Sequence, residues 1–568
     1  MVGTTCFAGV AMLTLVAPFE LTEPLLRLPR QSVSNLEAAV ACAFAFGAVA
    51  LAWSWRLPEW RTPLTWPWVA LILAMLVASA MSPVSRMNAF HMTGRLGAAF
   101  GIYLLAVNGV ATRARLHSVL TLSVAVGVGV SILAILEYRG LRPVLTSLTA
   151  FRPAVSTVGA QVRAGGPLQY PTIASMYLEV VFAFGLGLLL TELDAVRRAR
   201  VAVLFLALAV IAEAITLTFT RAGQITMATS LLLVGVVRRL QRPGDAGTGL
   251  IAGLAVVIAL LFAGSRSAES VWLRLTSEGQ ESWYRAKVVA PSALELPTGR
   301  RSSVPITVTN TGRLPWDSQA TPPMLLSYHW LAADGDRFVT FEGERTPFAN
   351  PVLPDATVSV DMQVRAPRQP GRYRLEWDLV QEGRLWFSSE PGAVRTMSRA
   401  TVEGDAFDEP VFTTPPPRPT IRPGRLVLWR AAARMFAAHP IAGVGPDNFR
   451  LAYGSYAGLV GADQRTHSNN MYLEMLAGGG LLVAAAFGWL LWRSAACALE
   501  IVAMGRRASV ASGAVALGLA AAILAIAVHA SVDSFLSFAP TYVLFSLTLG
   551  CAVACARGME ARPDAHRV

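Results

Sequence analysis

The chain has 568 residues, of which 54% are hydrophobic and 15% are charged, and its mean hydropathy is +0.48. A soluble protein of this length needs more charge to cover its surface, so the composition excludes an ordinary soluble enzyme and is typical of a polytopic membrane protein. The formal net charge of +12 comes from arginines spread through short loops. This spacing favours a role in orienting membrane helices over binding of nucleic acid.

Apolar segments of spanning length recur along the chain, and we expect about twelve transmembrane helices. The first segment has no basic n-region and no small-residue cleavage site, so it predicts a span rather than a cleaved signal peptide. The predicted spans are Val2–Ala17, Leu36–Trp55, Leu64–Met81, Ala89–Val110, Val119–Leu136, Thr172–Leu190, Val201–Phe219, Gln224–Val237, Leu250–Gly264, Met471–Leu491, Ser512–Ala530 and Phe538–Ala556.

The loop arginines predict the orientation of these helices. With the N-terminus inside, most of them fall in cytoplasmic loops, as the positive-inside rule requires. Those residues are Arg56, Arg61, Arg113, Arg115, Arg197, Arg198, Arg200, Arg238, Arg239, Arg242, Arg506, Arg507, Arg557, Arg562 and Arg567. Both termini are therefore predicted to be cytoplasmic, in a multi-pass protein of the bacterial inner membrane. One predicted external loop breaks the rule with Arg139, Arg142, Arg152 and Arg163, and binding an anion is one reason for arginines there.

A long polar stretch separates the ninth and tenth spans and is predicted to be periplasmic. Its apolar residues alternate with polar ones, as in half-buried strands. They are Val304, Ile306 and Val308, then Val358, Val360, Met362 and Val364, then Tyr373, Leu375, Trp377 and Leu379. Gly383 is predicted to close a hairpin back to Leu385 and Phe387, and the Pro-rich run Thr413–Pro423 to form a stiff linker. The pattern predicts a small β-sandwich similar to immunoglobulin-like domains, without their cystine.

The predicted fold is therefore an all-α polytopic membrane bundle with an inserted periplasmic immunoglobulin-like β-sandwich. Residues 1–264 are assigned to an N-terminal transmembrane bundle and 265–412 to the β-sandwich. Residues 413–470 are assigned to the linker and a periplasmic catalytic loop, and 471–568 to C-terminal transmembrane helices.

Several motifs lie on the predicted outer side of the membrane. Arg425–Trp429 begins an amphipathic segment, His439–Gly445 reads His-Pro-x-x-Gly-x-Gly, and His467–Asn470 precedes the tenth span. Thr220–Gly223 and, more loosely, Arg163–Pro171 accompany earlier spans. In order and spacing these motifs resemble the O-antigen ligase and O-antigen polymerase superfamily. The resemblance covers the membrane part and leaves out the β insert.

This resemblance implies a metal-independent glycosyltransferase with no cofactor. Such an enzyme takes a glycan from an undecaprenyl-diphosphate carrier and passes it to a hydroxyl group, usually with inversion at the sugar carbon. The acceptor is a glycan, a lipid or a protein. Ligation of a polysaccharide to lipid A-core, polymerisation of repeat units and protein O-glycosylation share these motifs, so the sequence leaves all three open, together with the sugar, the acceptor and the role of the insert.

The donor's leaving group is a lipid diphosphate, which fixed cations must bind. Arginine suits this because its planar fork binds phosphate oxygens in a bidentate way and stays charged. Arg221 and Arg425 are therefore predicted catalytic residues, with Arg163 as a further substrate-binding residue. The alternatives are snorkelling of Arg221 to the interface and contact of Arg425 with lipid headgroups.

The acceptor hydroxyl must lose a proton as it attacks, and histidine titrates near neutral pH. His467 is predicted to be this catalytic base, with Asn469 and Asn470 binding sugar hydroxyls. The alternative is an Asn-rich cap on the tenth span. His439 precedes a proline and is predicted to be structural.

Three other features carry weaker expectations. Asp334-Gly335-Asp336 looks like the motif of metal-dependent glycosyltransferases, but Asp-Gly between strands predicts a hairpin turn. Gly443 and Gly445 lack the strand and third glycine of a dinucleotide site, so they predict a turn. His529 and Asp533 share a helix face, where they either support the site or cap the helix.

Two rival classes remain. A transporter or flippase of lipid-linked glycans has a similar number of spans, but such folds are often built from internal repeats with sites near the bilayer midplane. This sequence has no evident repeat, and its distinctive polar residues lie at the outer surface. An adhesion or sensor module on a membrane anchor needs one span rather than about twelve.

Overall fold

The computed structural model describes residues 2–27, 32–54, 58–152, 156–158, 161–264, 283–320, 323–335, 337–382, 385–390, 393–405, 423–459, 462–507 and 510–560. The chain divides into two compact units, and each is described by itself. The helical unit comprises Met1–Ser267, Gly424–Leu459 and Gln464–Val568, and the β unit comprises Ala268–Pro423 with Val460–Asp463.

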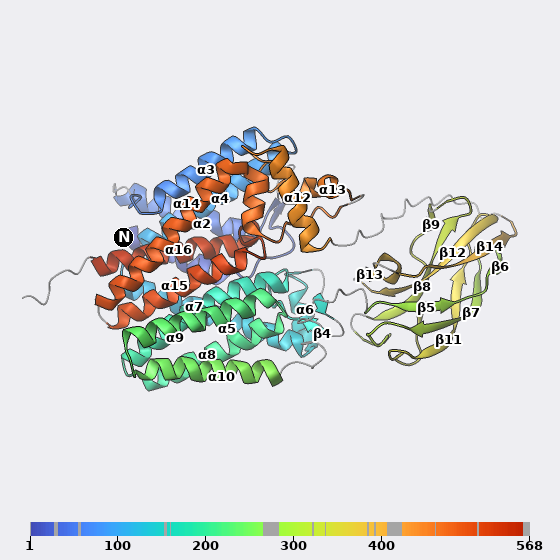
Figure 1. The fold of residues 1–568 in the computed structure, drawn as a ribbon, viewed down its shortest axis with the longest axis horizontal. Helices are drawn as coiled ribbons and strands as arrows, with labels where there is room; N and C mark the ends of the chain where they lie inside the picture. Colours follow the sequence, from blue (N-terminus) through green and yellow to red (C-terminus); the bar gives the residue numbers. More distant parts are fainter. Residues whose placement is uncertain are drawn as a thin grey trace, which may run out of the picture. The chain divides into compact units, whose positions relative to one another are not determined.

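Each predicted span corresponds to a helix in the helical unit (Figure 1). These helices are α1 (Val2–Val16), α2 (Asn35–Ser54), α3 (Thr65–Ala80), α4 (Arg86–Gly109), α5 (Arg113–Tyr138), α7 (Pro171–Asp194), α8 (Arg198–Leu217), α9 (Arg221–Gln241), α10 (Ala246–Gly264), α14 (Met471–Arg507), α15 (Val510–Ala530) and α16 (Ala539–Glu560). Shorter elements at the loops are α6 (Arg142–Leu148), α12 (Arg425–Ala438), α13 (Phe449–Ala457), η3 (Phe535–Ser537) and the two-stranded pairs β1 (Leu26–Arg27) with β2 (Ser32–Val33) and β3 (Ser156–Val158) with β4 (Gln161–Arg163).

Nine helices in the described part of the chain are long and apolar enough to cross a membrane. The helices α1 and α3 are apolar but have only 15 and 16 residues, and α9 contains Arg221, Arg238 and Arg239. A mostly helical membrane protein is therefore confirmed, whereas the number of about twelve spans stays a prediction.

Helix α7 lies at the centre of the helical unit. Nearly all its side chains are buried, and it packs against α5, α8, α9 and α15. Its contact with α15 is close because a Cβ atom at Gly518 would lie 2.8 Å from the backbone oxygen of Ala183, and one at Gly187 would lie 3.0 Å from that of Ala514. Small residues allow this approach, which packs membrane helices without a hydrophobic driving force.

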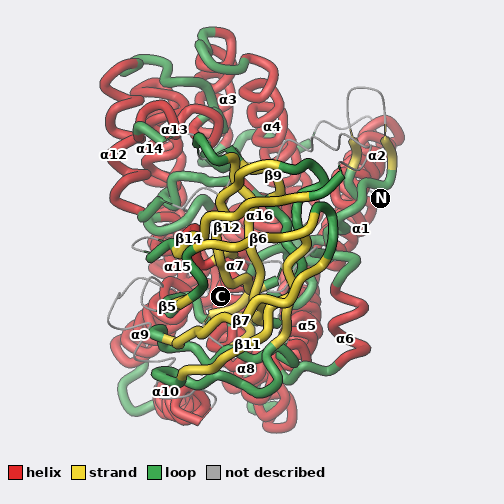
Figure 2. Tube along the Cα trace, turned by 90° about the vertical axis from the view of Figure 1, so that its right-hand side faces the viewer, coloured by secondary structure: helices red, strands yellow, loops and turns green. Residues whose placement is uncertain are grey.

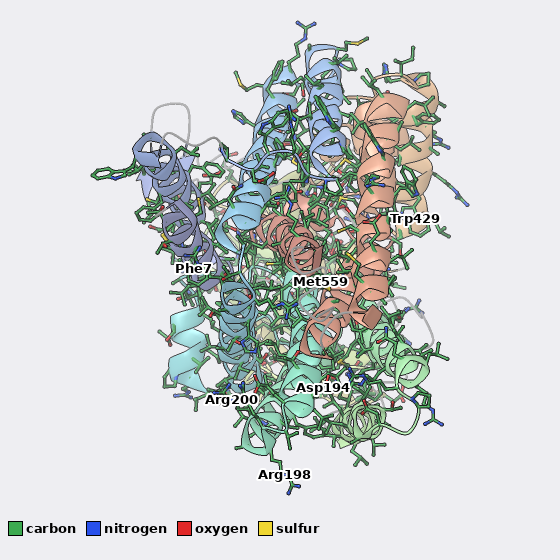
Figure 3. All side chains as sticks on the ribbon, turned by 90° about the vertical axis from the view of Figure 1, so that its left-hand side faces the viewer. Phe7, Asp194, Arg198, Arg200, Trp429 and Met559 are labelled. Carbon is green, nitrogen blue, oxygen red and sulfur yellow. The ribbon has the colours of Figure 1, made fainter. Side chains whose placement is uncertain are left out.

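The helical unit has two ends that differ in their residues. The site end is where α7 begins and where α12 and α13 lie (Figure 1). The opposite end is where α7 ends, and Asp194, Arg198 and Arg200 are labelled there in Figure 3. At the opposite end Arg238 of α9 donates from Nη1 to Asp194 Oδ2 over 2.9 Å, so an ion pair joins α7 to α9.

Helix α14 is interrupted at Gly480, whose φ is 62° and ψ is −161°. The backbone after α12 fills this break: Val444 N and Gly445 N donate to the carbonyls of Ala477 and Gly478, and Leu481 N donates to Pro440 O. Gly443 and Gly445 also adopt positive φ, as the predicted turn requires. The His-Pro-x-x-Gly-x-Gly motif therefore satisfies the open backbone of a broken helix, and His439 caps α12.

The β unit contains two sheets, whose strands are yellow in Figure 2. One sheet has the order β10-β8-β12-β14-β6, with β13 on β12 and β9 on β8, and the other has the order β11-β7-β5. The strands are β5 (Ala286–Val289), β6 (Ala293–Pro297), β7 (Arg301–Asn310), β8 (Met324–Ala332), β9 (Phe338–Thr340), β10 (Thr346–Pro347), β11 (Thr357–Arg365), β12 (Gly371–Gln381), β13 (Leu385–Trp386) and β14 (Thr396–Glu403), with η2 (Phe387–Ser389) after β13.

The predicted alternating residues form the core of the β unit. Side chains of both sheets, among them Ile306, Met362 and Leu375, belong to one buried cluster, because one face of each strand turns inward. Asp334 and Gly335 lie in the turn between β8 and β9, so the predicted turn is confirmed there, and Asp336 lies outside the described residues. Gly383 and Thr413–Arg422 also lie outside them. The immunoglobulin-like topology stays a prediction.

Candidate functional site

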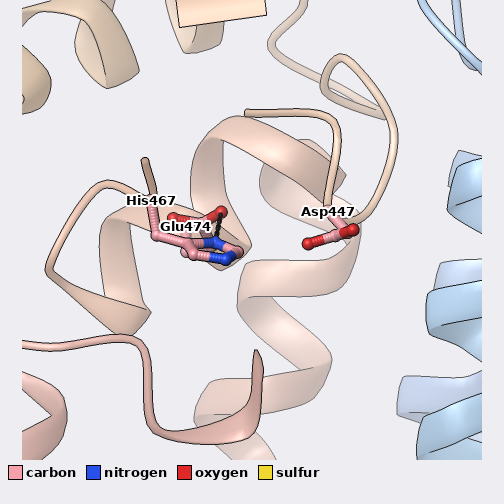
Figure 4. A group of neighbouring side chains, drawn as sticks. All are labelled: Asp447, His467 and Glu474. Carbon is pink, nitrogen blue, oxygen red and sulfur yellow. Dashed lines mark hydrogen bonds and ion pairs between the residues drawn. The ribbon is translucent and has the colours of Figure 1, made fainter. Parts of the chain in front are cut away.

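His467 lies in the loop before α14, beside a carboxylate of that helix. Its Nδ1 is 3.2 Å from Glu474 Oε1, and Glu474 Oε2 accepts from the backbone N–H of Ser468 over 2.8 Å. Figure 4 shows the imidazole and this carboxylate side by side. The side chain of His467 is 14% exposed and that of Glu474 7%. Because Nδ1 faces the carboxylate, the neutral ring carries its proton on Nδ1 and its lone pair on Nε2.

Asp447 and Arg450 complete what we call the histidine group, together with His467 and Glu474. Arg450 Nε donates to Asp447 Oδ2 over 2.9 Å, and Arg450 Nη2 donates to Asn88 Oδ1 over 2.6 Å. Asp447 has a φ of 60°, which is unusual for a residue other than glycine. Backbone strain of this kind persists where surrounding contacts fix it, and here those contacts come from α4 and α13.

The pKa of His467 is governed by burial and by these charges. Burial lowers this pKa, but the hydrogen bond and negative charge of Glu474 and the charge of Asp447 together raise it above the ordinary value, although Arg450 acts in the opposite sense. A larger share of His467 is therefore protonated near neutral pH than for an exposed histidine. If the neutral ring is the reactive form, activity is lost as the pH falls through this raised pKa.

Asp447, His467 and Glu474 could also hold a metal ion. Each offers one ligand atom, and these atoms lie within 4.8 Å of one another. Imidazole and carboxylate ligands suit several divalent transition metals. In this structure Asp447 instead forms an ion pair with the guanidinium of Arg450, so an arginine side chain already balances its negative charge. The expectation that no metal takes part stays a prediction.

The loop of His467 is fixed on both sides by hydrogen bonds. Trp429 Nε1, one turn after Arg425 on α12, donates to Ser468 O over 3.1 Å. Asn470 Oδ1 accepts from Leu473 N over 3.0 Å, and Asn470 Nδ2 donates to Ser531 O over 2.8 Å. The amide of Asn470 thus caps α14 and anchors the loop to the end of α15, as the alternative interpretation of this residue requires. Asn469 turns the chain with a φ of 52°.

Arg163 and Arg221 lie close together at the site end, and we call them the arginine group. Arg163 Nε donates to Thr218 O over 3.0 Å, and its Nη2 donates to Thr220 Oγ1 over 3.4 Å. Arg221 is exposed and is the first residue of α9. The positive end of the α9 dipole adds to these two charges, so this position favours a bound anion.

The loop that carries Arg163 is held by a buried ion pair. Glu137, at the end of α5, pairs with Arg152, and its Oε2 accepts from the backbone N–H groups of Gly165 and Gly166 over 3.0 and 2.8 Å. Both side chains are almost fully buried. Arg152 thus breaks the loop-charge rule because it neutralises Glu137, and anion binding is not needed to explain it.

A second buried group joins α7, α9 and α15. His529 Nδ1 is 2.9 Å from Glu179 Oε1 and Oε2, and Thr226 Oγ1 donates to Glu179 Oε2 over 2.6 Å. We call these three residues the Glu179 group. Arg425 lies close enough for its charge to act on His529, as does Asp533. His529 is therefore engaged with α7 and is not a helix cap.

The predicted residues are thus distributed over neighbouring groups at one end of the helical unit. Arg163 lies beside Arg221, while His467 lies with Asp447, Glu474 and Arg450. A small cavity beside Asp447 and Glu474 is lined mainly by apolar side chains and glycines, among them Met75, Met92, Met471 and Met475. A single outer cavity shared by Arg221, Arg425 and His467 stays a prediction.

Glu474, Asp447 and Arg450 were not foreseen from the sequence. Glu474 had a usable signal, because a carboxylate inside an apolar span needs a partner and is often functional. Glu179 in α7 carries the same signal. Asp447 and Arg450 lie in a polar loop, where one more charged residue predicts nothing.

Comparison with known proteins bears on this same segment. Residues 417–488, which include Arg425, Trp429, Asp447, His467 and Glu474, match a family model described as O-antigen ligase. No curated protein matches the chain. The resemblance to the O-antigen ligase superfamily is therefore confirmed over residues 417–488, and with the membrane helices it supports a membrane enzyme of glycosyl transfer.

Proposed function

We propose that the protein is a metal-independent glycosyltransferase of the inner membrane. It moves a glycan from an undecaprenyl-diphosphate carrier to an acceptor hydroxyl at the periplasmic face, as an O-antigen ligase or a polysaccharide polymerase. The observation that carries this proposal is the pairing of His467 with Glu474 inside the segment that matches the O-antigen ligase family. Protein O-glycosylation is a variant of the same chemistry with a different acceptor.

The histidine group supplies the chemistry at the acceptor. Glu474 orients the imidazole through Nδ1, so Nε2 takes the proton of the hydroxyl as the oxygen attacks the sugar carbon. The new bond joins the acceptor oxygen to this carbon, and the bond from the carbon to the diphosphate oxygen breaks with its electron pair on the diphosphate. Attack from the face opposite the leaving group inverts the sugar carbon. The carboxylate of Glu474 then stabilises the imidazolium that forms.

Arginines supply the chemistry at the donor. Arg221 and Arg425 bind the diphosphate and stabilise the negative charge that grows on it as the sugar leaves. Arg163 adds its charge and fixes the turn before Arg221 through Thr218 and Thr220. These fixed guanidinium groups are already oriented before reaction, so they can replace the metal that other glycosyltransferases place on a diphosphate.

The two ends of the helical unit support the proposed orientation. Arg197, Arg198 and Arg200 lie in or beside the turn between α7 and α8 at the opposite end, and the positive-inside rule assigns such an end to the cytoplasm. The site end and the β unit are then periplasmic, and we propose that the β unit is a separately folding domain that binds the acceptor. Reporter fusions at Ala320 and at the C-terminus test this: opposite sides are expected, and the same side contradicts it.

A lipid-linked glycan flippase is the main rival, and the break in α14 bears on it. Broken helices in transporters often bind substrate through their open backbone. Here the open backbone groups of α14 form hydrogen bonds with the backbone of Pro440, Val444 and Gly445, so they are not available to a substrate. This favours an enzyme over a transporter.

Glycan analysis of a deletion strain tests the proposed function and separates its variants. Loss of long chains from the lipid is expected for a ligase, and loss of chain length alone for a polymerase. Complementation with His467→Ala is expected to fail although the protein is inserted normally. Accumulation of unflipped carrier on the cytoplasmic side would instead indicate a flippase.

A further inference from the structure

The buried Glu179 group connects the two halves of the proposed site, which are the arginine group and the histidine group. Glu179 lies on α7, Thr226 on α9 and His529 on α15, and all three side chains are nearly or fully buried. Thr226 follows Arg221 by little more than one turn of α9, and its Oγ1 donates a hydrogen bond to Glu179 Oε2 over 2.6 Å. Glu179 therefore holds the helix whose first residue is Arg221.

The same carboxylate reaches the histidine half of the site through α15. His529 is the second-last residue of α15. The end of this helix accepts two hydrogen bonds from the His467 segment: Asn470 Nδ2 donates to Ser531 O over 2.8 Å, and Tyr472 Oη donates to Ala527 O over 2.7 Å. A displacement of His529 relative to Glu179 thus moves the end of α15 on which the loop of His467 rests.

His529 differs from a histidine that has only a structural role. In the β unit the buried His329 uses both ring nitrogens, with Nδ1 on Phe341 O and Nε2 on Asp378 Oδ2. His529 is equally buried, but among the described residues its Nε2 meets no hydrogen-bond partner. A buried polar atom without a partner is costly, so Nε2 of His529 does not add to the stability of the helical unit as the two bonded nitrogens of His329 do in the β unit.

We propose that Glu179 and His529 are positioning residues for glycosyl transfer, which set the distance between the diphosphate-binding Arg221 and the base His467. The inference rests on the proposed function. Thr226 is the third member, through which the pair acts on α9. The charge of Arg425 also acts on His529.

The molecule provides a matched control in the ion pair of Asp194 with Arg238. This pair joins the same helices α7 and α9 and is also buried, but it lies at the opposite end. Asp194→Asn and Glu179→Gln therefore remove one carboxylate charge each from the same helix. A purely structural role predicts the same consequences for both, whereas a positioning role predicts a kinetic defect for Glu179→Gln alone.

The test uses purified full-length protein with a lipid-linked glycan donor and its acceptor. We expect Glu179→Gln and His529→Gln to lower kcat about 10–100-fold, as for a misplacement of reacting groups by about 1 Å, with little change in the KM for the acceptor. Asp194→Asn is expected to lower the melting temperature while kcat stays within about twofold of wild type. If Glu179→Gln also keeps near-normal kcat, the inference is overturned.

Milder variants keep the test decisive if Glu179→Gln does not fold. Thr226→Val keeps the volume and removes the hydrogen bonds of the hydroxyl to Glu179 and to Gly223 O. Its control is Thr229→Val on the exposed side of α9, which loses a hydrogen bond to Ile225 O. We expect Thr226→Val to lower kcat and Thr229→Val to leave kcat unchanged. Equal kcat values for the two variants would overturn the inference.

A binding measurement separates this inference from the proposed function. Undecaprenyl diphosphate is expected to raise the melting temperature of wild type and of Asp194→Asn, and to raise that of Glu179→Gln by less. If wild type neither binds this diphosphate nor transfers the glycan, the proposed function fails and the inference falls with it. If wild type does both and Glu179→Gln behaves like Asp194→Asn, the inference alone fails.

Discussion

Helix α7 carries Glu179 towards the site end and Glu192 and Asp194 at the opposite end, and these carboxylates have different partners. Asp194, at the opposite end, pairs with Arg238 and Arg242, whose charges do not change near neutral pH. Glu179, towards the site end, pairs instead with a histidine, His529. The ion pair at the opposite end therefore joins α7 to α9, whereas at the site end Glu179 joins α7 to α15 through His529 and to α9 through Thr226.

The contrast extends to two further carboxylates, Glu192 of α7 and Glu474 of α14. At the opposite end, Glu192 meets Arg197 and Arg200 as well as His117. At the site end, Glu474 meets His467. At the site end the proposed base is itself paired with a carboxylate, as expected when an environment tunes the pKa values of reacting groups. The following predictions test whether the two ends differ in function as well as in composition.

The largest expected effect is that of His467→Ala. Removal of the base is expected to lower the rate of transfer about 10²–10⁴-fold, the usual contribution of general acid–base catalysis, while the protein still inserts and folds. Rates are measured with purified lipid-linked glycan. His91→Ala, at an exposed histidine of α4, is the control and keeps normal activity. A His467→Ala variant with near-normal turnover would refute the proposed mechanism.

Arg221→Lys is expected to lower transfer about 10²-fold, as for the loss of one oriented donor to a developing charge. Lysine keeps the charge but cannot form the bidentate contact with a phosphate. Arg239→Lys, at an exposed arginine of the same helix at the opposite end, is the matched control. Equal activity of the two variants would remove the functional difference between the ends of α9.

Glu474→Gln is expected to shift the acid limb of the pH profile to lower pH. The charge of Glu474 raises the pKa of His467, so its loss lets the imidazole deprotonate at lower pH. Wild type should lose kcat/KM as the pH falls through the raised pKa. Glu59→Gln, at an exposed carboxylate, should leave the profile unchanged. An acid limb that stays in place in Glu474→Gln would show that His467 is not the titrating base.

The smallest effect is expected on stability, at the crossing of α7 and α9 near the site end. A Cβ atom at Gly223 would lie 1.8 Å from Ser175 Oγ, so Gly223→Ala is expected to cost about 1–3 kcal/mol. Ser175→Ala should restore part of this loss. Gly253→Ala, where a Cβ meets nothing within 4 Å, should not destabilise. Thermal melting in detergent measures all three, and an unchanged melting temperature for Gly223→Ala would contradict the close crossing.

Hydropathy was enough to predict the helices and the alternating strands, because both follow from local patterns. The predicted segment Gln224–Val237 is part of α9. The arginines of α9 lower its hydropathy, so this helix is not among those apolar enough to cross a membrane. The turn at Asp334 and Gly335 was also predictable from turn chemistry. The immunoglobulin-like topology stays a prediction, since strand order depends on contacts between distant segments.

The candidate site was predictable only in part. His467, Arg221 and Arg425 belong to motifs, but the contact of Arg163 with Thr218 and Thr220 joins segments far apart in the chain. Asn470 was predicted to bind sugar hydroxyls, with a helix cap as the alternative; the structure shows the cap, and sugar binding stays a prediction. Anion binding was one reason considered for the arginines of the loop that contains Arg152, which in the structure pairs with Glu137. A sequence lists polar residues in a loop, but it does not say which of them bind the protein itself.

The central claim is that the arginines and His467 of the chain carry out transfer without a metal ion. The most direct measurement is the initial rate of transfer by purified wild-type protein, from a lipid-linked glycan, after exhaustive chelation of divalent cations. The account predicts an unchanged rate, because it assigns diphosphate binding to arginines and because Asp447 already forms an ion pair with Arg450. A rate that falls to background in chelator and returns with a divalent metal would contradict it, and would make Asp447, His467 and Glu474 a metal site.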